Sequence, residues 1–147
     1  MTAIEFDKPL TTRSVAETEK LAGRFLELLN SSDVVALYGP LGAGKTCFVR
    51  GLAMAAGISA DEVNSPSFTL VNEYHGPQMS IFHFDLYRAK NPAEFYGIGG
   101  EEYLTRDGLI VIEWAENGNG YIPEKRYEIS FEIVDESSRR LVFSRRD

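Results

Sequence analysis

The chain has 147 residues, of which 44% are hydrophobic and 25% charged, so its composition is that of a folded globular protein. Its net charge of −7, from 22 acidic and 15 basic residues, argues against a protein that grips the phosphate backbone of nucleic acid unaided. Cys47 is the only cysteine and no apolar stretch is long enough to span a membrane, which excludes an internal disulfide, a zinc site of several cysteines and a transmembrane helix. We expect a single domain, residues 1–147, in the cytoplasm.

The first part of the chain predicts a strand, a helix and a second strand that leads into a glycine-rich loop. Ile4–Phe6 has the pattern of a short edge strand. Ser14 and Glu17 form a capping box, and the apolar residues that follow recur at helical spacing. Val34–Tyr38 is an apolar run typical of a buried strand, and Cys47–Ala56 predicts a largely buried helix.

The loop between that strand and helix, Gly39–Thr46, matches the phosphate-binding pattern G-x-x-x-x-G-K-[ST] in full. Its glycines let backbone N–H groups curl round a phosphate, and the helix N-terminus adds its dipole. Lys45 would supply a mobile positive charge from an exposed junction, and the Thr46 hydroxyl can hold Mg²⁺. The alternative is a glycine turn that ends in Lys-Thr by chance. We predict that the loop binds a nucleoside triphosphate through Leu41, Gly42, Ala43, Gly44, Lys45, Thr46 and Cys47.

The second part of the chain predicts two antiparallel hairpins, a short helix and a central strand. The hairpins are formed by four β-rich runs: Phe68–Tyr74 with Met79–Leu86, and Tyr127–Ile133 with Arg139–Phe143. The helix begins at Asn91, which is followed by a proline at the first turn. Leu109–Ile112 is the apolar run expected of a strand covered on both faces. We therefore predict a three-layer α/β P-loop NTPase fold with a mixed parallel and antiparallel sheet.

Two acidic residues lie where a phosphate loop needs a further group to complete the Mg²⁺ shell or organise water. Glu113 ends the strand 109–112, and Asp85 shares one strand face with His83 and Tyr87. Inward-facing polar groups are costly unless they bind something. The alternatives are a solvent-facing stripe for these three residues and, for Glu113, a carboxylate paired with a nearby cation. We predict Asp85 and Glu113 as catalytic residues, and Thr46 and Glu113 as the metal ligands.

The remaining candidates each admit two interpretations. His83 either orients water or only forms local hydrogen bonds. Arg88 either forms a salt bridge, which we favour, or stabilises charge on the transferring phosphate. Cys47 is interpreted as a packing residue rather than a nucleophile. Core positions are favoured over base stacking for Phe68, Phe82 and Phe84, and solvated strand-end charges over a nucleic-acid site for Arg139, Arg140, Arg145 and Arg146.

Four sequence blocks, in this order, resemble the bacterial TsaE family: Gly39–Thr46, Ser65–Tyr74, His83–Arg88 and Val111–Trp114. That family is the small ATPase subunit of the machinery that makes threonylcarbamoyladenosine in tRNA. The resemblance covers nearly the whole chain and implies ATP and Mg²⁺ as cofactors. It also implies two partners, the threonylcarbamoyl transferase subunit TsaD and its companion TsaB, with tRNA met only indirectly.

By position, the resemblance gives phosphate and metal roles to Lys45, Thr46 and Glu113, and the role of the family's essential acidic residue to Asp85. The segment Ser65–Thr69 resembles a switch beside the γ-phosphate, and Trp114 is a family residue without a derived role. The departures from the family pattern are mild: Pro40 for an acidic or amide residue, Cys47 for a second Thr, and Ser67 for Thr.

The sequence is therefore compatible with three functions. The first is an ATP-hydrolysing subunit that drives a conformational cycle in a tRNA-modifying assembly. The second is a small-molecule P-loop kinase, which the short stretch from Arg88 to Leu109 disfavours because it leaves little room for a lid. The third is a nucleotide-sensing module without hydrolysis.

Overall fold

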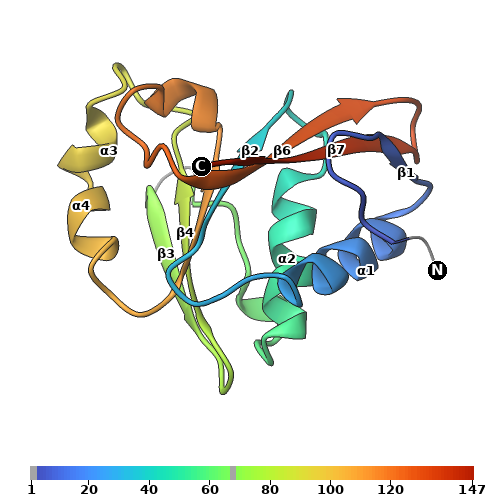
Figure 1. Cartoon of the computed structure of the whole chain (residues 1–147), viewed down its shortest axis with the longest axis horizontal. Helices are drawn as coiled ribbons and strands as arrows, with labels where there is room; N and C mark the ends of the chain where they lie inside the picture. The colour runs from blue at the N-terminus through green and yellow to red at the C-terminus, as the bar shows by residue number, and fades with distance from the viewer. Residues whose placement is uncertain (1–2, 67–68) are drawn as a thin grey trace.

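The computed structural model describes residues 3–66 and 69–147, and in this part of the chain seven strands form one twisted sheet (Figure 1). Their spatial order is β1-β7-β6-β2-β5-β4-β3. The strands are β1 (Leu10–Thr12), β2 (Val34–Tyr38), β3 (Val71–His75), β4 (Ser80–Asp85), β5 (Leu109–Glu113), β6 (Arg126–Ile133) and β7 (Arg139–Arg146). The helices are α1 (Val15–Leu26), α2 (Lys45–Ala55), α3 (Glu94–Gly97) and α4 (Gly100–Tyr103), with 3₁₀ turns η1 (Ala60–Glu62) and η2 (Ala115–Gly118).

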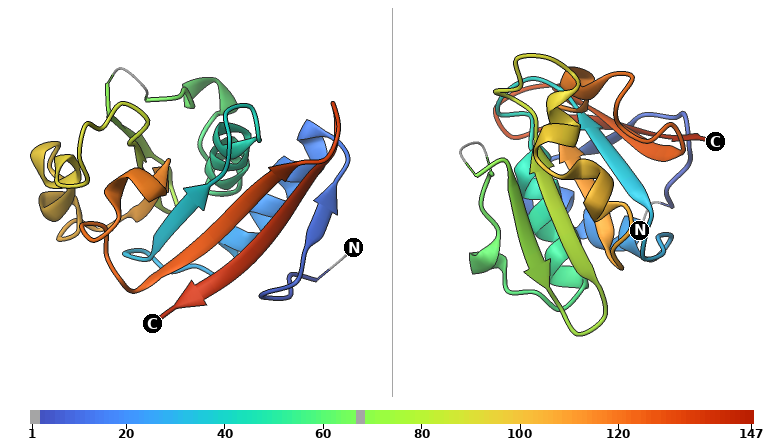
Figure 2. Two further views of the ribbon diagram at one scale, coloured as in Figure 1. Left: turned by 90° about the horizontal axis from the view of Figure 1, so that it is seen from above. Right: turned by 90° about the vertical axis from the view of Figure 1, so that its left-hand side faces the viewer.

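The centre of the sheet is parallel and its edges are antiparallel. β2 pairs in parallel with both β5 and β6, and β4 pairs in parallel with β5. The β3–β4 and β6–β7 hairpins lie toward opposite ends of the sheet (Figure 2). All five residues of β5 are buried, which explains the unbroken apolar run that ends in an acid. The predicted mixed α/β architecture is confirmed.

Helices cover both faces of the sheet (Figure 1). α1 and α2 pack on one face, where Phe25 and Phe48 contact Phe143 of β7. α3 and α4 lie on the other face, over Phe82 and Phe84, which are 1% and 0% exposed. The core interpretation of these two phenylalanines is confirmed, whereas Phe68 lies outside the described residues. No helix in residues 3–66 and 69–147 is both long enough and apolar enough to cross a bilayer.

Two local predictions differ from the structure. The prediction of a strand at Ile4–Phe6 is wrong, because the backbone turns at Asp7, whose φ is +66°. The edge strand is Leu10–Thr12 instead, paired with residues 139–141 of β7. The predicted short helix is present as α3, but it begins at Glu94, with Ala93 as its N-cap, rather than at Asn91. A second helix, α4, follows it. Gly99, with a φ of +91°, separates the two in a conformation that an L side chain rarely adopts.

Glu73 of β3 ties the edge of the sheet to the end of α4. Its carboxylate accepts hydrogen bonds from Arg106 at 2.9 and 3.0 Å and from the Tyr103 hydroxyl at 2.6 Å. These bonds, that of Arg106 foremost, lower the pKa of Glu73 to about 2. Because the unfolded pKa is about 4.3, the cluster stabilises the fold above that pH and loses its effect as the pH falls toward 2.

We therefore expect Glu73→Gln to lower the melting temperature at pH 7 and to match wild type at pH 2. Thermal unfolding of both proteins by circular dichroism between these pH values measures the difference. A difference that stays constant across the range would contradict the role of this carboxylate.

Candidate functional site

The loop between β2 and α2 has the backbone shape that its glycines permit. Gly42 and Gly44 have φ values of +80° and +99°, in the left-handed region. At Gly39, a Cβ would lie 2.8 Å from the carbonyl oxygen of Phe131, so only glycine fits there. α2 begins at Lys45, directly after Gly44. Since glycine brings no side chain to the first-turn N–H groups, this helix start is suited to an anion.

A pocket of about 460 Å³ opens over this loop. It brings together four separate parts of the chain, including every residue predicted to bind nucleotide and both predicted acids. Its lining residues are Leu41, Gly42, Ala43, Gly44, Lys45, Thr46, Cys47, Ser65, Asp85, Tyr87, Arg88, Glu113 and Trp114.

Lys45 is buried in this structure, with only 4% of its surface exposed. Its ammonium group donates to the carbonyl oxygens of Gly39 and Pro40 and lies 3.4 Å from the ring centre of Trp114. Burial lowers the pKa of Lys45, and nearby carboxylates, Glu116 first, oppose that shift. The expected exposed junction is therefore wrong, because the loop's own carbonyls and an aromatic ring enclose the lysine stem and its charge.

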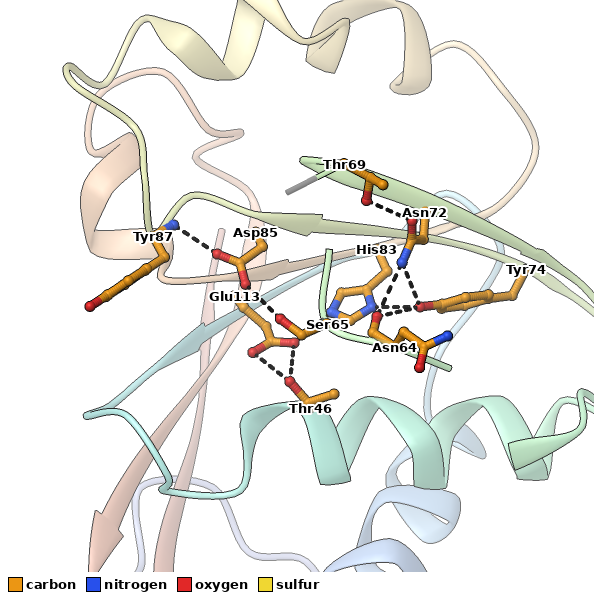
Figure 3. Close-up of polar contacts among 10 residues, drawn as sticks. All are labelled: Thr46, Asn64, Ser65, Thr69, Asn72, Tyr74, His83, Asp85, Tyr87 and Glu113. Atoms are coloured by element: carbon orange, nitrogen blue, oxygen red, sulfur yellow. Dashed lines mark hydrogen bonds and ion pairs between the residues drawn. The ribbon is translucent and has the colours of Figure 1, made fainter. Parts of the chain in front are cut away.

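Thr46 and Glu113 are in direct contact across the pocket (Figure 3). The Thr46 hydroxyl lies 2.8 and 3.0 Å from the two carboxylate oxygens, to which it donates. The hydroxyl keeps its lone pairs, so the two side chains together present the hard oxygen donors that Mg²⁺ prefers. The described residues contain no group of three or more His, Cys, Asp or Glu side chains that could hold a metal. Mg²⁺ suits such a sparse donor set, since it usually keeps waters and takes phosphate oxygens.

Asp85 and His83 face the interior rather than solvent, with exposures of 2% and 0%. One carboxylate oxygen of Asp85 accepts the backbone N–H of Tyr87 at 2.7 Å, and the other accepts the Ser65 hydroxyl at 3.2 Å (Figure 3). Tyr87 lies beyond the end of β4 and is 49% exposed, with its ring centre 4.8 Å from that of Trp114. The solvent-facing alternative is thus wrong for His83 and Asp85 and fits only Tyr87.

His83 is hydrogen-bonded on both ring nitrogens. Its Nε2 lies 2.6 Å from Glu113 and its Nδ1 2.9 Å from the hydroxyl of Tyr74. The Glu113 carboxylate therefore contacts the Thr46 hydroxyl on one side and the His83 ring on the other.

Other candidates lie at the rim of the pocket. Arg88 is exposed and lines it. The Cys47 sulfur is 3.7 Å from the carbonyl oxygen of Val15, and burial raises the pKa of this thiol to about 11, which fits packing rather than nucleophilic attack. Of the switch-like segment Ser65–Thr69, Ser65 lines the pocket, while residues 67 and 68 lie outside the described part of the chain.

No local sequence pattern predicts the contact between Arg139 and the loop. The guanidinium donates to the carbonyl oxygen of Gly42 at 3.0 Å, from a residue 97 positions away. The interpretation as solvated charge fits Arg140 and Arg145, which form exposed ion pairs with Glu132 and Asp147. Arg139 differs because the β6–β7 hairpin brings its side chain against the glycine-rich loop.

Comparison with known proteins gives matches along nearly the whole chain. The family model described as "Threonylcarbamoyl adenosine biosynthesis protein TsaE" matches residues 12–141. A protein of Treponema pallidum named "tRNA threonylcarbamoyladenosine biosynthesis protein TsaE" is 38% identical over 130 residues, which is 88% of this chain and 95% of that protein. Its namesake in Bacillus subtilis is 34% identical over 139 residues, covering 93% and 86% of the two chains.

A solved structure agrees with the sequence matches. The crystal structure of Bacillus subtilis YdiB resembles this one with a TM-score of 0.76 and 27% sequence identity, covering 95% of this chain and 86% of that chain. The mixed sheet, the glycine-rich loop and these matches give one consistent result: the fold is that of a P-loop NTPase, and the chain belongs to the TsaE family.

Proposed function

We propose that this chain is the ATP-binding and ATP-hydrolysing subunit of the complex that forms threonylcarbamoyladenosine in tRNA. The contact of Thr46 with Glu113, at 2.8 Å beside the phosphate-binding loop, is the observation that carries the proposal. Asp85 lines the same pocket, so a hydroxyl, two acids and a helix N-terminus converge on one volume. The role in tRNA modification is the one that the family description and the relatives' names carry.

Each group has a distinct task in this proposal. The backbone N–H groups of the loop and the ammonium of Lys45 bind the phosphates of ATP. Thr46 and Glu113 hold Mg²⁺, which when bound would neutralise charge on the phosphate oxygens. Asp85, whose two oxygens are held by Tyr87 and Ser65, is the group that orients the attacking water or accepts its proton.

Phosphoryl transfer to a small metabolite is less well supported than transfer to water. The stretch that would have to close over a second substrate forms α3 and α4, which pack on the sheet. Phe95 of α3 is 0% exposed, with its ring centre 5.2 Å from that of Phe84. Arg106, which follows α4, forms an ion pair with Glu73. These contacts oppose the movement of an arginine-rich lid.

The composition of the pocket also supports dependence on partners. Among the described residues that line it, the cationic side chains are Lys45 and Arg88. P-loop enzymes without a committed arginine at the transferring phosphate hydrolyse slowly until a partner completes the site, which is worth about 10³–10⁵ in rate. We propose TsaD and TsaB as the partners that complete it, with tRNA held by them in the cytoplasm.

We therefore expect very slow ATP hydrolysis by the isolated chain and a rate at least about tenfold higher when TsaD and TsaB are both present. Steady-state ATPase assays of the chain alone, with each partner and with both, measure this. A full rate from the isolated chain, unchanged by partners, would contradict the subunit role. Phosphate transfer to metabolites in place of water would support the kinase instead.

A further inference from the structure

Behind Glu113 lies a buried polar pair to which the proposed function gives no task. Tyr74 of β3 and His83 of β4 are 3% and 0% exposed. The Tyr74 hydroxyl lies 2.9 Å from Nδ1 of His83, and Nε2 of the same ring lies 2.6 Å from the Glu113 carboxylate (Figure 3). With Glu113 ionised, Nε2–H is the donor, because a carboxylate only accepts. A continuous line of hydrogen bonds therefore runs from Thr46 through Glu113 to Tyr74.

The line ends on the backbone of the segment before the switch-like residues. The Tyr74 hydroxyl has one proton, which it shares between Nδ1 of His83 and the carbonyl oxygen of Asn64, 3.0 Å away. The Asn72 amide donates to the same carbonyl oxygen at 3.1 Å. Thr69 donates to the Asn72 side-chain oxygen at 2.8 Å, which fixes the orientation of that amide. Burial raises the pKa of Tyr74, so its hydroxyl keeps the proton that these contacts need.

Hydrogen bonds connect both acids of the site, Asp85 and Glu113, to the two-residue segment Asn64–Ser65. Ser65, next to Asn64 in the chain, donates to Asp85 at 3.2 Å. Glu113 reaches Asn64 through His83 and Tyr74. In the sheet, Asp85 and Glu113 are register partners on neighbouring strands. A movement of the segment Asn64–Ser65 would therefore act on both carboxylates at once.

We propose that Tyr74 and His83 are positioning residues that hold Glu113 against Thr46 in the orientation that binds Mg²⁺, and that couple this orientation to the segment Asn64–Ser65. The inference rests on the proposed function, because it assigns Mg²⁺ to Glu113. Groups at metal sites are oriented by the hydrogen bonds behind them, and loss of one such bond lowers metal affinity or activity by about 10–100-fold. The cost of burying a tyrosine hydroxyl and an imidazole is offset here, because the hydroxyl and both ring nitrogens have hydrogen-bond partners.

Tyr74→Phe tests this role, since it removes one hydroxyl and keeps the ring. The measurement is the dissociation constant of a fluorescent ATP analogue, titrated with Mg²⁺ and in EDTA. We expect the Mg²⁺ concentration for half-maximal tightening to rise about 10–100-fold. Affinity in EDTA should equal wild type, because the loop backbone and Lys45 bind the phosphates without Tyr74.

Tyr103→Phe is the matched control. Its hydroxyl donates to Glu73 at 2.6 Å, at the same edge of the sheet but without connection to Glu113. Both variants should lower the melting temperature, whereas only Tyr74→Phe should change the Mg²⁺ titration. Equal Mg²⁺ titrations in the two variants would overturn the positioning role, because a merely structural hydroxyl behaves in this way.

His83→Gln and the double variant give a second, independent test. Since Tyr74 acts on Glu113 only through the His83 ring, Tyr74→Phe should have no further effect on the Mg²⁺ titration in the His83→Gln background. Additive effects would overturn the coupling. A wild type that binds nucleotide without any effect of Mg²⁺ would overturn the proposed function and this inference with it. If the wild type responds to Mg²⁺ and the Tyr74→Phe variant gives the same Mg²⁺ titration, only this inference is overturned and the proposed function stands.

Discussion

Asp85→Asn is expected to lower ATP turnover by about 10²-fold or more while nucleotide affinity stays near the wild-type value. Asparagine keeps the size of the side chain, an oxygen that can accept the Tyr87 N–H, and an amide that can donate to Ser65. The pocket should therefore keep its shape. The amide cannot accept a proton from water, so the hydrolytic step is the one that suffers. Steady-state ATPase assays with both partners, beside titration of a fluorescent ATP analogue, measure the two quantities.

Two further variants make this result specific. Asp33→Asn is the matched control, because the Asp33 carboxylate also accepts a backbone N–H, that of Asn30 at 2.7 Å, but lies before β2 at the opposite end from the loop. It should turn over ATP at the wild-type rate. Glu113→Ala should instead weaken Mg²⁺-dependent nucleotide binding, since it removes the partner of Thr46. Equal binding defects in Asp85→Asn and Glu113→Ala would contradict this division of tasks.

Lys45→Ala is expected to weaken ATP binding by about 10- to 150-fold, the loss of about 1.5–3 kcal/mol of charge-assisted hydrogen bonding to phosphate. In this structure the ammonium also donates to Gly39 and Pro40, so the variant should melt at a lower temperature than wild type. Lys45→Met keeps most of the apolar length of the side chain and removes the ammonium group with its charge and its N–H donors. Both variants should show the same loss of affinity in titrations with the fluorescent analogue.

The control for the lysine is Lys125→Ala, which removes one exposed positive charge next to the start of β6, away from the loop. Its nucleotide affinity should equal that of wild type, which separates a contact at the phosphate from a change in net charge. Wild-type affinity in both Lys45 variants would show that the loop does not bind phosphate through this residue.

Local sequence patterns correctly predicted those strands, helix caps and loop conformations that are determined by residues close together in the chain. Val34–Tyr38 is a strand with the predicted bounds, because an apolar run between polar ends needs no distant information. Ser14 caps α1 as the capping box indicates, with its hydroxyl accepting from the Glu17 N–H at 3.1 Å. Gly42 and Gly44 occupy positive φ values that the loop pattern anticipates.

Contacts between distant segments were beyond the reach of those patterns. Strand alternation placed His83 on the correct face, but its bond to Glu113 depends on β4 lying beside β5 in the sheet. Lys45 is buried because Trp114 and the loop carbonyls meet over it, which no local spacing encodes. The three-residue strand Leu10–Thr12 exists because β7 offers an edge to pair with.

Different parts of this fold should tolerate insertions and deletions to very different degrees during evolution. Glu113 is the register partner of Asp85 on one side and of Leu37, near the end of β2, on the other. A strand that gains or loses one residue turns every later side chain to the opposite face. Such a change within β4 or β5 would send Asp85 or Glu113 toward α3 and α4, whereas added residues in the loop between those helices would leave both acids in place. The lengths of β4 and β5 should therefore vary least among descendants of this chain.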